Sequence, residues 1–125
     1  MKRELDFGII ELSEDGILRF KACPSLSTIS LSQLKEMLEV LVEVSDGKPR
    51  PFFSDNSNMK SLGHVERKFI GNNLHRFALA SAVKETSLMV RSIGFAINHL
   101  FPPKVPMQMF NSEEDAIAWL MSFRK

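Results

Sequence analysis

Apolar and polar residues alternate in two segments near the start of the chain. The apolar positions are Leu5, Phe7 and Ile9 in the first segment and Leu18, Phe20 and Ala22 in the second. A period of two is typical of a β-strand that buries one face and exposes the other. Between the segments, Asp15-Gly16 supplies residues that tolerate positive φ in a tight turn. The pattern therefore predicts a β-hairpin, which Pro24 ends.

Apolar residues then recur every three or four positions, which predicts helices. The first helix starts at a capping box formed by Ser30 and Gln33 and stops before Asp46-Gly47. Its apolar stripe consists of Leu31, Leu34, Met37, Leu38, Leu41 and Val42. A shorter helix is expected over Gly63 to Ile70, ended by Gly71-Asn72-Asn73 because Gly and Asn accept the left-handed conformation.

Two further helices are predicted in the second half of the chain. One starts at Thr86 or Ser87 and runs to Phe101, where Pro102-Pro103 stops it. The other is capped by Asn111 together with Glu114, and its inner face contains Ala116, Trp119, Leu120 and Phe123.

Three short apolar runs separate these helices and predict buried strands. They are Pro51 to Ser54, Phe77 to Val83, and Val105 to Phe110. The resulting order is ββαβαβαβα in a single domain over residues 1–125. Alternating strands and helices after an opening hairpin predict an α/β fold, with a mostly parallel or mixed sheet, an antiparallel edge hairpin, and helices packed on the sheet.

Composition and charge limit the classes of partner and the location that we expect for this protein. The 125 residues include 16 basic and 15 acidic side chains, a formal charge of +1, so we expect no nucleic-acid partner. No apolar run approaches the ~20 residues of a spanning helix, so we expect no integral membrane association. The single Cys23 and the acidic start of the chain, which lacks an apolar signal sequence, predict a cytoplasmic protein.

The candidate site lies between the strand at Phe52 and the helix at Gly63. Ligands in open α/β sheets usually bind at the carboxyl ends of strands, and this loop is rich in polar residues. The residues expected to form a partner surface are Asp55, Asn56, Ser57, Asn58, Lys60, Ser61 and Gly63. His64 and Arg67, near Lys60 and Lys68, are candidate contacts for an anion at the helix start; a solvated helix face is the alternative interpretation.

Motifs for catalysis and cofactor binding are not found. His64, His75 and His99 lack the spacing of metal ligands, and no phosphate-binding or dinucleotide-binding motif is present, so we expect no metal, cofactor or catalytic residue. Cys23 is expected to be a buried, inert thiol.

The order of elements and the central loop resemble the STAS domains of anti-sigma-factor antagonists, and among them the SpoIIAA-like, or STAS/SEC14-like, proteins. Those antagonists carry a two-part motif: an Asp-Leu-Ser-like stretch on the third strand, and then an Asp-Ser-Ser-Gly-like helix start whose serine a partner kinase phosphorylates. Here Asp55-Asn56-Ser57-Asn58-Met59 matches the first part of the motif, and Lys60-Ser61-Leu62-Gly63 occupies the place of the second, without an acid directly before the serine. The resemblance implies a kinase-like or anti-sigma-like protein partner and makes Ser61 and Ser57 the candidate phosphorylation sites, unless this function has been lost.

Three functions remain open at this stage. The first is a regulatory, non-enzymatic module that presents residues 55–63 to a protein partner. The second, suggested by the SEC14 side of the resemblance and by the number of Phe and Met residues, is a binder or carrier of a small apolar or lipid-like ligand. The third is an enzyme on an anionic substrate, with Asp55 or His64 as acid or base.

Overall fold

The computed structural model describes residues 1–55, 60–84, 97, 99–100 and 102–124. Over these residues six strands form one sheet, in the spatial order β1-β2-β3-β4-β5-β6. The strands are β1 (Lys2–Leu5), β2 (Gly8–Leu12), β3 (Leu18–Ala22), β4 (Arg50–Asp55), β5 (Ala78–Lys84) and β6 (Met107–Phe110). The helices are α1 (Leu31–Val44), α2 (His64–Asn73), the short 3₁₀ helix η1 (Leu74–Arg76) and α4 (Glu113–Met121).

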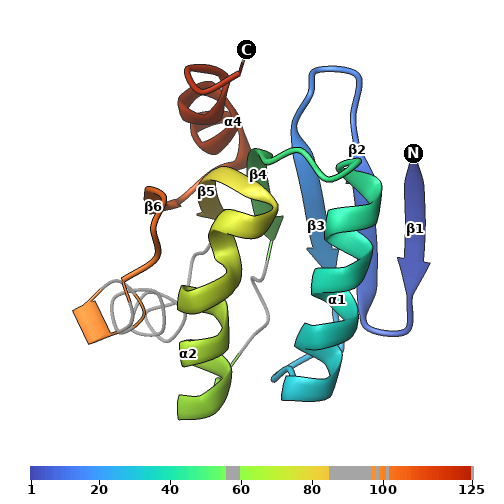
Figure 1. Ribbon diagram of the computed structural model, residues 1–125, viewed down its shortest axis with the longest axis vertical. Helices are drawn as coiled ribbons and strands as arrows, with labels where there is room; N and C mark the ends of the chain where they lie inside the picture. The colour runs from blue at the N-terminus through green and yellow to red at the C-terminus, as the bar shows by residue number, and fades with distance from the viewer. Residues whose placement is uncertain (56–59, 85–96, 98, 101, 125) are drawn as a thin grey trace.

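The sheet is mixed, as the sequence predicts. β1, β2 and β3 pair antiparallel, whereas β3, β4, β5 and β6 run parallel. β4 and β5 lie inside the sheet, and α1 and α2 lie side by side on one of its faces (Figure 1). Burial on both faces explains why the segments around Phe52 and Leu79 are almost free of charge.

Two apolar cores occupy the two faces of the sheet. The larger core packs α1 and α2 against the strands, and its members include Phe20, Leu38, Leu41, Phe52 and Leu74. The smaller core packs α4 against β4 and β5 and consists of Ile17, Phe53, Ala80, Ala82, Ala116 and Leu120. Neighbouring residues of β4 thus contribute to opposite cores, as the period of two in a strand requires.

The opening of the chain differs from the prediction. The segment from Leu5 to Ile10 is not one strand, because the chain turns at Asp6 and Phe7 and forms a third antiparallel strand, β1. Gly8 begins β2 where there is no room for a side chain: a Cβ there would lie 2.6 Å from the ring of Phe20 and 2.7 Å from the Lys21 carbonyl oxygen. The predicted turn at Gly16 is confirmed, with φ +81°.

The ends of α1 agree with the sequence pattern. Ser30 Oγ accepts a hydrogen bond from Gln33 N at 3.1 Å, and Gln33 Oε1 accepts one from Ser30 N at 2.9 Å. This is the predicted capping box, which satisfies two backbone donors at the helix start. After α1, Asp46 and Gly47 have φ of 59° and 70°, so the chain leaves the helix through left-handed residues.

The predicted end of α2 is wrong. Gly71, Asn72 and Asn73 are helical, and the chain continues directly into η1. Asn73 Nδ2 donates to the Phe69 carbonyl oxygen at 2.8 Å, so this amide bonds within the helix and does not end it. The next residue, Leu74, is 3% exposed and anchors the extended helix in the larger core.

Three other predicted boundaries need comment. The N-cap of α4 is Ser112 rather than Asn111, because Ser112 Oγ accepts from Asp115 N at 3.2 Å. β6 begins at Met107, two residues later than expected. The helix expected from Thr86 or Ser87 to Phe101 falls largely outside the described residues, although Ile97, His99 and Leu100 are helical.

Candidate functional site

Part of the predicted partner surface is described and exposed. Lys60, Ser61 and Gly63 are exposed, whereas Asn56, Ser57 and Asn58 lie outside the described residues. The amides of Lys60 and Ser61 both donate to the carbonyl oxygen of Ser27, at 2.7 and 3.2 Å. These bonds hold the segment before α2 against the connection that precedes α1.

Asp55 is on a different side of the sheet from this segment. The preceding residue, Ser54, belongs to the cavity wall on the face covered by α1 and α2. Because side chains alternate along a strand, Asp55 lies on the opposite face, in register with Lys21 of β3 and Lys84 of β5. The structure therefore does not bring Asp55 together with the start of α2, where the sequence suggested an acid or base.

The start of α2 is formed by Gly63 and not by a capping serine. Gly63 is the N-cap residue, and no side chain among the described residues caps the helix, so Ser61 does not cap α2. A Cβ on Gly63 would clash with Glu66 Oε1, which shows how closely this carboxylate approaches the helix start. Glu66 already supplies a negative charge to the positive end of the helix dipole, and an external anion there would meet it.

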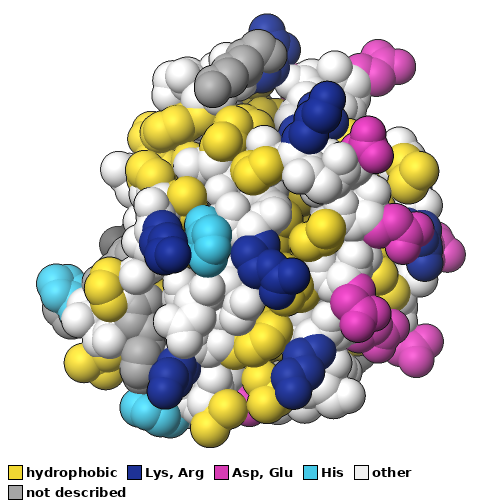
Figure 2. All heavy atoms as spheres, viewed as in Figure 1, with side chains coloured by type: hydrophobic (Ala, Val, Ile, Leu, Met, Phe, Trp, Pro, Cys, Tyr) yellow, Lys and Arg dark blue, Asp and Glu magenta, His cyan; other side chains and the backbone are white. Residues whose placement is uncertain are grey.

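The two predicted anion contacts differ in accessibility. His64 is exposed, whereas Arg67 is partly buried and its Nε has no hydrogen-bond partner in the part of the chain that the structure describes. Lys, Arg and His side chains lie over α2, and Asp and Glu side chains gather over α1 (Figure 2). The exposed charged residues concerned are Lys60, Lys68 and Arg76 near α2 and Glu36, Glu39 and Glu43 on α1. Anion binding at this basic surface stays a prediction.

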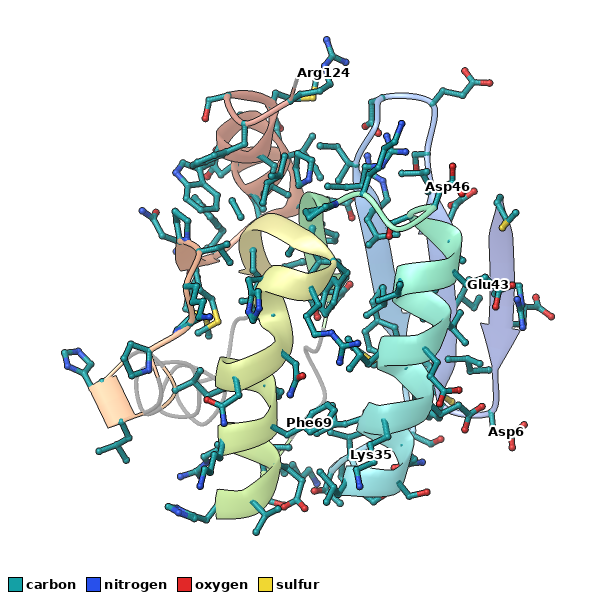
Figure 3. The ribbon with its side chains drawn as sticks, viewed as in Figure 1. Asp6, Lys35, Glu43, Asp46, Phe69 and Arg124 are labelled. Atoms are coloured by element: carbon teal, nitrogen blue, oxygen red, sulfur yellow. The ribbon has the colours of Figure 1, made fainter. Side chains whose placement is uncertain are left out.

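An apolar cavity of about 110 Å³ lies between the sheet and helices α1 and α2. Its lining includes Leu34 and Met37 of α1, Phe52 of β4, Phe69 and Ile70 of α2, and Leu62 from the segment before α2. Phe69 extends from α2 toward α1, near Lys35, and forms part of the wall between the two helices (Figure 3). The second sequence-based hypothesis requires a cavity of this kind.

Among the described residues, three polar side chains interrupt the apolar lining: Ser54, Asn73 and Ser81. The Asn73 amide is already engaged, because it donates to the Phe69 carbonyl oxygen and accepts from Arg76 Nη1 at 3.4 Å. Ser54 and Ser81 are only 4% and 2% exposed, and neither hydroxyl hydrogen-bonds to another described residue. These two hydroxyl groups are thus the lining groups with unused hydrogen-bonding capacity.

Neither serine is among the candidate site residues that the sequence pattern indicates. Ser54 ended a predicted strand, and Ser81 interrupted an apolar run. In the sheet, Phe52 pairs with Ser81 and Ser54 pairs with Val83, so both serines face the same side of two neighbouring strands. The sequence did contain a signal for these residues, because a serine in an interior strand buries its hydroxyl. The cavity itself could be located only from the packing of the helices on the sheet.

Cys23 is not the buried thiol that was expected. It is partly exposed after β3, and its Sγ lies 3.2 Å from Ser25 Oγ. The hydrogen bonds from the Ser25 side chain and backbone lower the pKa of the Cys23 thiol below its ordinary value. Neither His64 nor His75 forms a metal site with neighbouring ligands: no group of three or more His, Cys, Asp or Glu is arranged for a metal among the residues described.

Within the same residues, no helix is both long and apolar enough to cross a membrane.

The chain belongs to the family described as Domain of unknown function (DUF7793), whose sequence profile matches residues 10–124. It is also similar in structure to an uncharacterized protein of the DUF3478 family with a SpoIIAA-like fold from Shewanella loihica PV-4. The TM-score is 0.60 with 19% sequence identity, and the alignment covers 96% of this chain and 98% of that chain.

This likeness confirms the SpoIIAA-like fold that the element order suggested. At this level of identity it concerns the architecture alone. A comparison with curated proteins found no match.

Proposed function

We propose that this protein is a non-enzymatic regulatory module that binds a small, mainly apolar molecule in the cavity between the sheet and α1 and α2. The observation that supports the proposal is the cavity itself, about 110 Å³ in volume and lined almost entirely by Leu, Ile, Val, Met and Phe. An apolar cavity of roughly 150 Å³ in another protein binds benzene. The volume therefore fits a ligand about the size of one aromatic ring or a short alkyl chain.

Toluene is a suitable probe, because it has this size and no hydrogen-bonding group. A ligand that binds only the folded protein stabilises it by RT ln(1 + [L]/Kd), which is about 1.4 kcal/mol at ten times Kd. We expect toluene to raise the urea midpoint of the wild-type protein. In Val83→Phe, the larger side chain occupies part of the cavity, and the increase should disappear.

Val65→Phe is the matched control, since Val65 on α2 is 56% exposed and does not line the cavity. This variant should respond to toluene as the wild type does. Leu38→Phe provides a second way to fill the cavity if Val83→Phe is too unstable to measure. An unchanged wild-type midpoint, or an equal increase in Val83→Phe, would argue against the proposed site.

A protein partner at residues 60–63 is a second candidate function, and one contact favours it. Lys60, Ser61 and Gly63 are exposed, while Leu62, between them, is 5% exposed and lines the cavity. A molecule in the cavity would touch Leu62 and so affect the backbone that displays its exposed neighbours. In this proposal the surface reports whether the cavity is occupied, and phosphorylation of Ser61 would add about two negative charges to it.

A photo-crosslinking amino acid at position 61 tests the partner surface, with the same group at the exposed Ser32 of α1 as the control. Crosslinking in lysate should give a discrete product from position 61. Adding the Ser61→Asp protein as a competitor should reduce the amount of this product. Equal products from positions 61 and 32 would count against a partner at this segment. Mapping phosphate on the protein after incubation with ATP and lysate would show whether Ser61 is modified.

A further inference from the structure

We infer that the ligand of this cavity is an uncharged molecule with an apolar body and a single hydroxyl or carbonyl group, which hydrogen-bonds to Ser54 and Ser81. This inference rests on the proposed function and specifies the ligand's chemical class. Its basis is the pair of serines, 4% and 2% exposed, whose hydroxyls line the cavity without a hydrogen bond to any described residue. Buried polar groups in folded proteins are nearly always paired.

The lining also sets the charge of the ligand. Its described residues include no Asp, Glu, Lys, Arg or His, so a charged group inside the cavity would have no partner of opposite sign. Burying an unpaired charge costs far more than burying a hydroxyl or carbonyl group that receives a hydrogen bond. A carboxylate or an ammonium group is therefore disfavoured inside the cavity.

The sheet determines where the polar group of the ligand binds. Ser54 and Ser81 are diagonal neighbours on β4 and β5, because Ser81 pairs with Phe52, two residues before Ser54. Their hydroxyls lie on the strand side of the cavity, opposite the apolar residues of α1 and α2, such as Leu34 and Ile70. A ligand consequently points its polar group to the sheet and its apolar body toward the helices.

Phenol and toluene distinguish this inference from the proposed function, since the two molecules are similar in size and differ in one hydroxyl group. The experiment measures the dissociation constants of both probes for the wild type and for Ser54→Ala/Ser81→Ala. Phenol is more strongly hydrated than toluene, so the informative quantity is the ratio of the two constants. We expect the ratio of the phenol constant to the toluene constant to rise at least about fivefold in the double variant, since each hydrogen bond lost between neutral groups weakens binding by about that factor.

Ser45→Ala is the control. Ser45 is fully buried, but its hydroxyl donates to the Val42 carbonyl oxygen at 3.0 Å and it does not line the cavity, so the ratio should stay at the wild-type value. A second measurement needs no variant: backbone amide shifts at Ser54 and Ser81 should differ between the phenol and toluene complexes of the wild type. Toluene binding with an unchanged ratio and equal amide shifts would overturn the inference and leave the proposed function standing. Failure of both probes to bind would overturn both.

Discussion

Phe77 packs edge-on against Phe52, with ring centroids 5.1 Å apart and ring planes at 86°. The pair joins the residue before β5 to the interior strand β4, and both rings are buried in the cavity wall. Phe77→Ala should lower the free energy of unfolding by about 3–5 kcal/mol, because it removes both the aromatic contact and buried apolar surface. Urea titration measures this loss.

Leu100→Ala is the comparison for this prediction, since Leu100 is 64% exposed. Its free energy of unfolding should change by less than about 0.5 kcal/mol. Phe77→Ala should also enlarge the cavity and admit ligands larger than toluene. A small loss of stability in Phe77→Ala would mean that the ring is less tightly packed than its contact with Phe52 indicates.

The capping box at the start of α1 gives a second prediction. Ser30→Ala removes the acceptor for Gln33 N and should lower the free energy of unfolding by about 1 kcal/mol. Ser61→Ala should have almost no effect, because Gly63, and not Ser61, caps α2. Thermal or urea unfolding of the two variants gives the comparison, and equal losses would contradict the observed caps.

The sequence was sufficient to predict the features that depend on local pattern. The capping box at Ser30 and the end of α1 before Asp46-Gly47 follow from residue types at fixed spacing, and both are present. The parallel arrangement of β3 to β6 follows from the alternation of strands and helices. The family likeness of the fold was therefore accessible from the order of elements alone.

Features that depend on packing were not accessible in the same way. Gly71 has the residue type of a helix end, yet the burial of Leu74 keeps the chain helical past it. The turn at Phe7 breaks an alternation that otherwise predicts one strand. The cavity depends on how α1 and α2 rest on the sheet, and no sequence period reports the space between two packed surfaces.

Arg19 provides a third prediction, because it connects the turn after β2 to α4. Its guanidinium lies 2.6 Å from Asp15 and 3.5 Å from Glu113, and Nε donates to Ser13 Oγ at 3.0 Å. The Arg19 side chain is 24% exposed, so solvent screens these contacts only in part. Arg19→Met should lower the free energy of unfolding by about 1–2 kcal/mol, with a smaller loss in high salt.

Arg3→Met is the control for Arg19, because Arg3 pairs with Glu43 at a more exposed position, 43% and 59% exposed. Exposed ion pairs contribute little to stability, so the free energy of unfolding of this variant should fall by less than about 1 kcal/mol. Urea midpoints of both variants at low and high salt make the test. An equal loss of unfolding free energy in the Arg3 and Arg19 variants would contradict the prediction that burial strengthens the Arg19 contacts.

The last prediction concerns the pH dependence of Cys23, the single cysteine of the chain. Hydrogen bonds from Ser25 stabilise the thiolate, so the pKa of Cys23 is below its ordinary value of 9.0. Alkylation by iodoacetamide requires the thiolate, and its rate should therefore reach half of its maximum at a pH below 9.0. Ser25→Ala should move this midpoint to higher pH, since it removes the side-chain hydrogen bond, whereas Ser27→Ala, at an exposed neighbouring position, should leave it unchanged. The same hydrogen bonds make the free energy of unfolding depend on pH, because they favour the Cys23 thiolate in the folded protein. This stabilisation is complete above the pKa of the thiol in the unfolded chain and is lost as the pH falls through the pKa in the folded protein. Identical alkylation midpoints for the wild type and Ser25→Ala would show that the Ser25 side chain does not control the thiol.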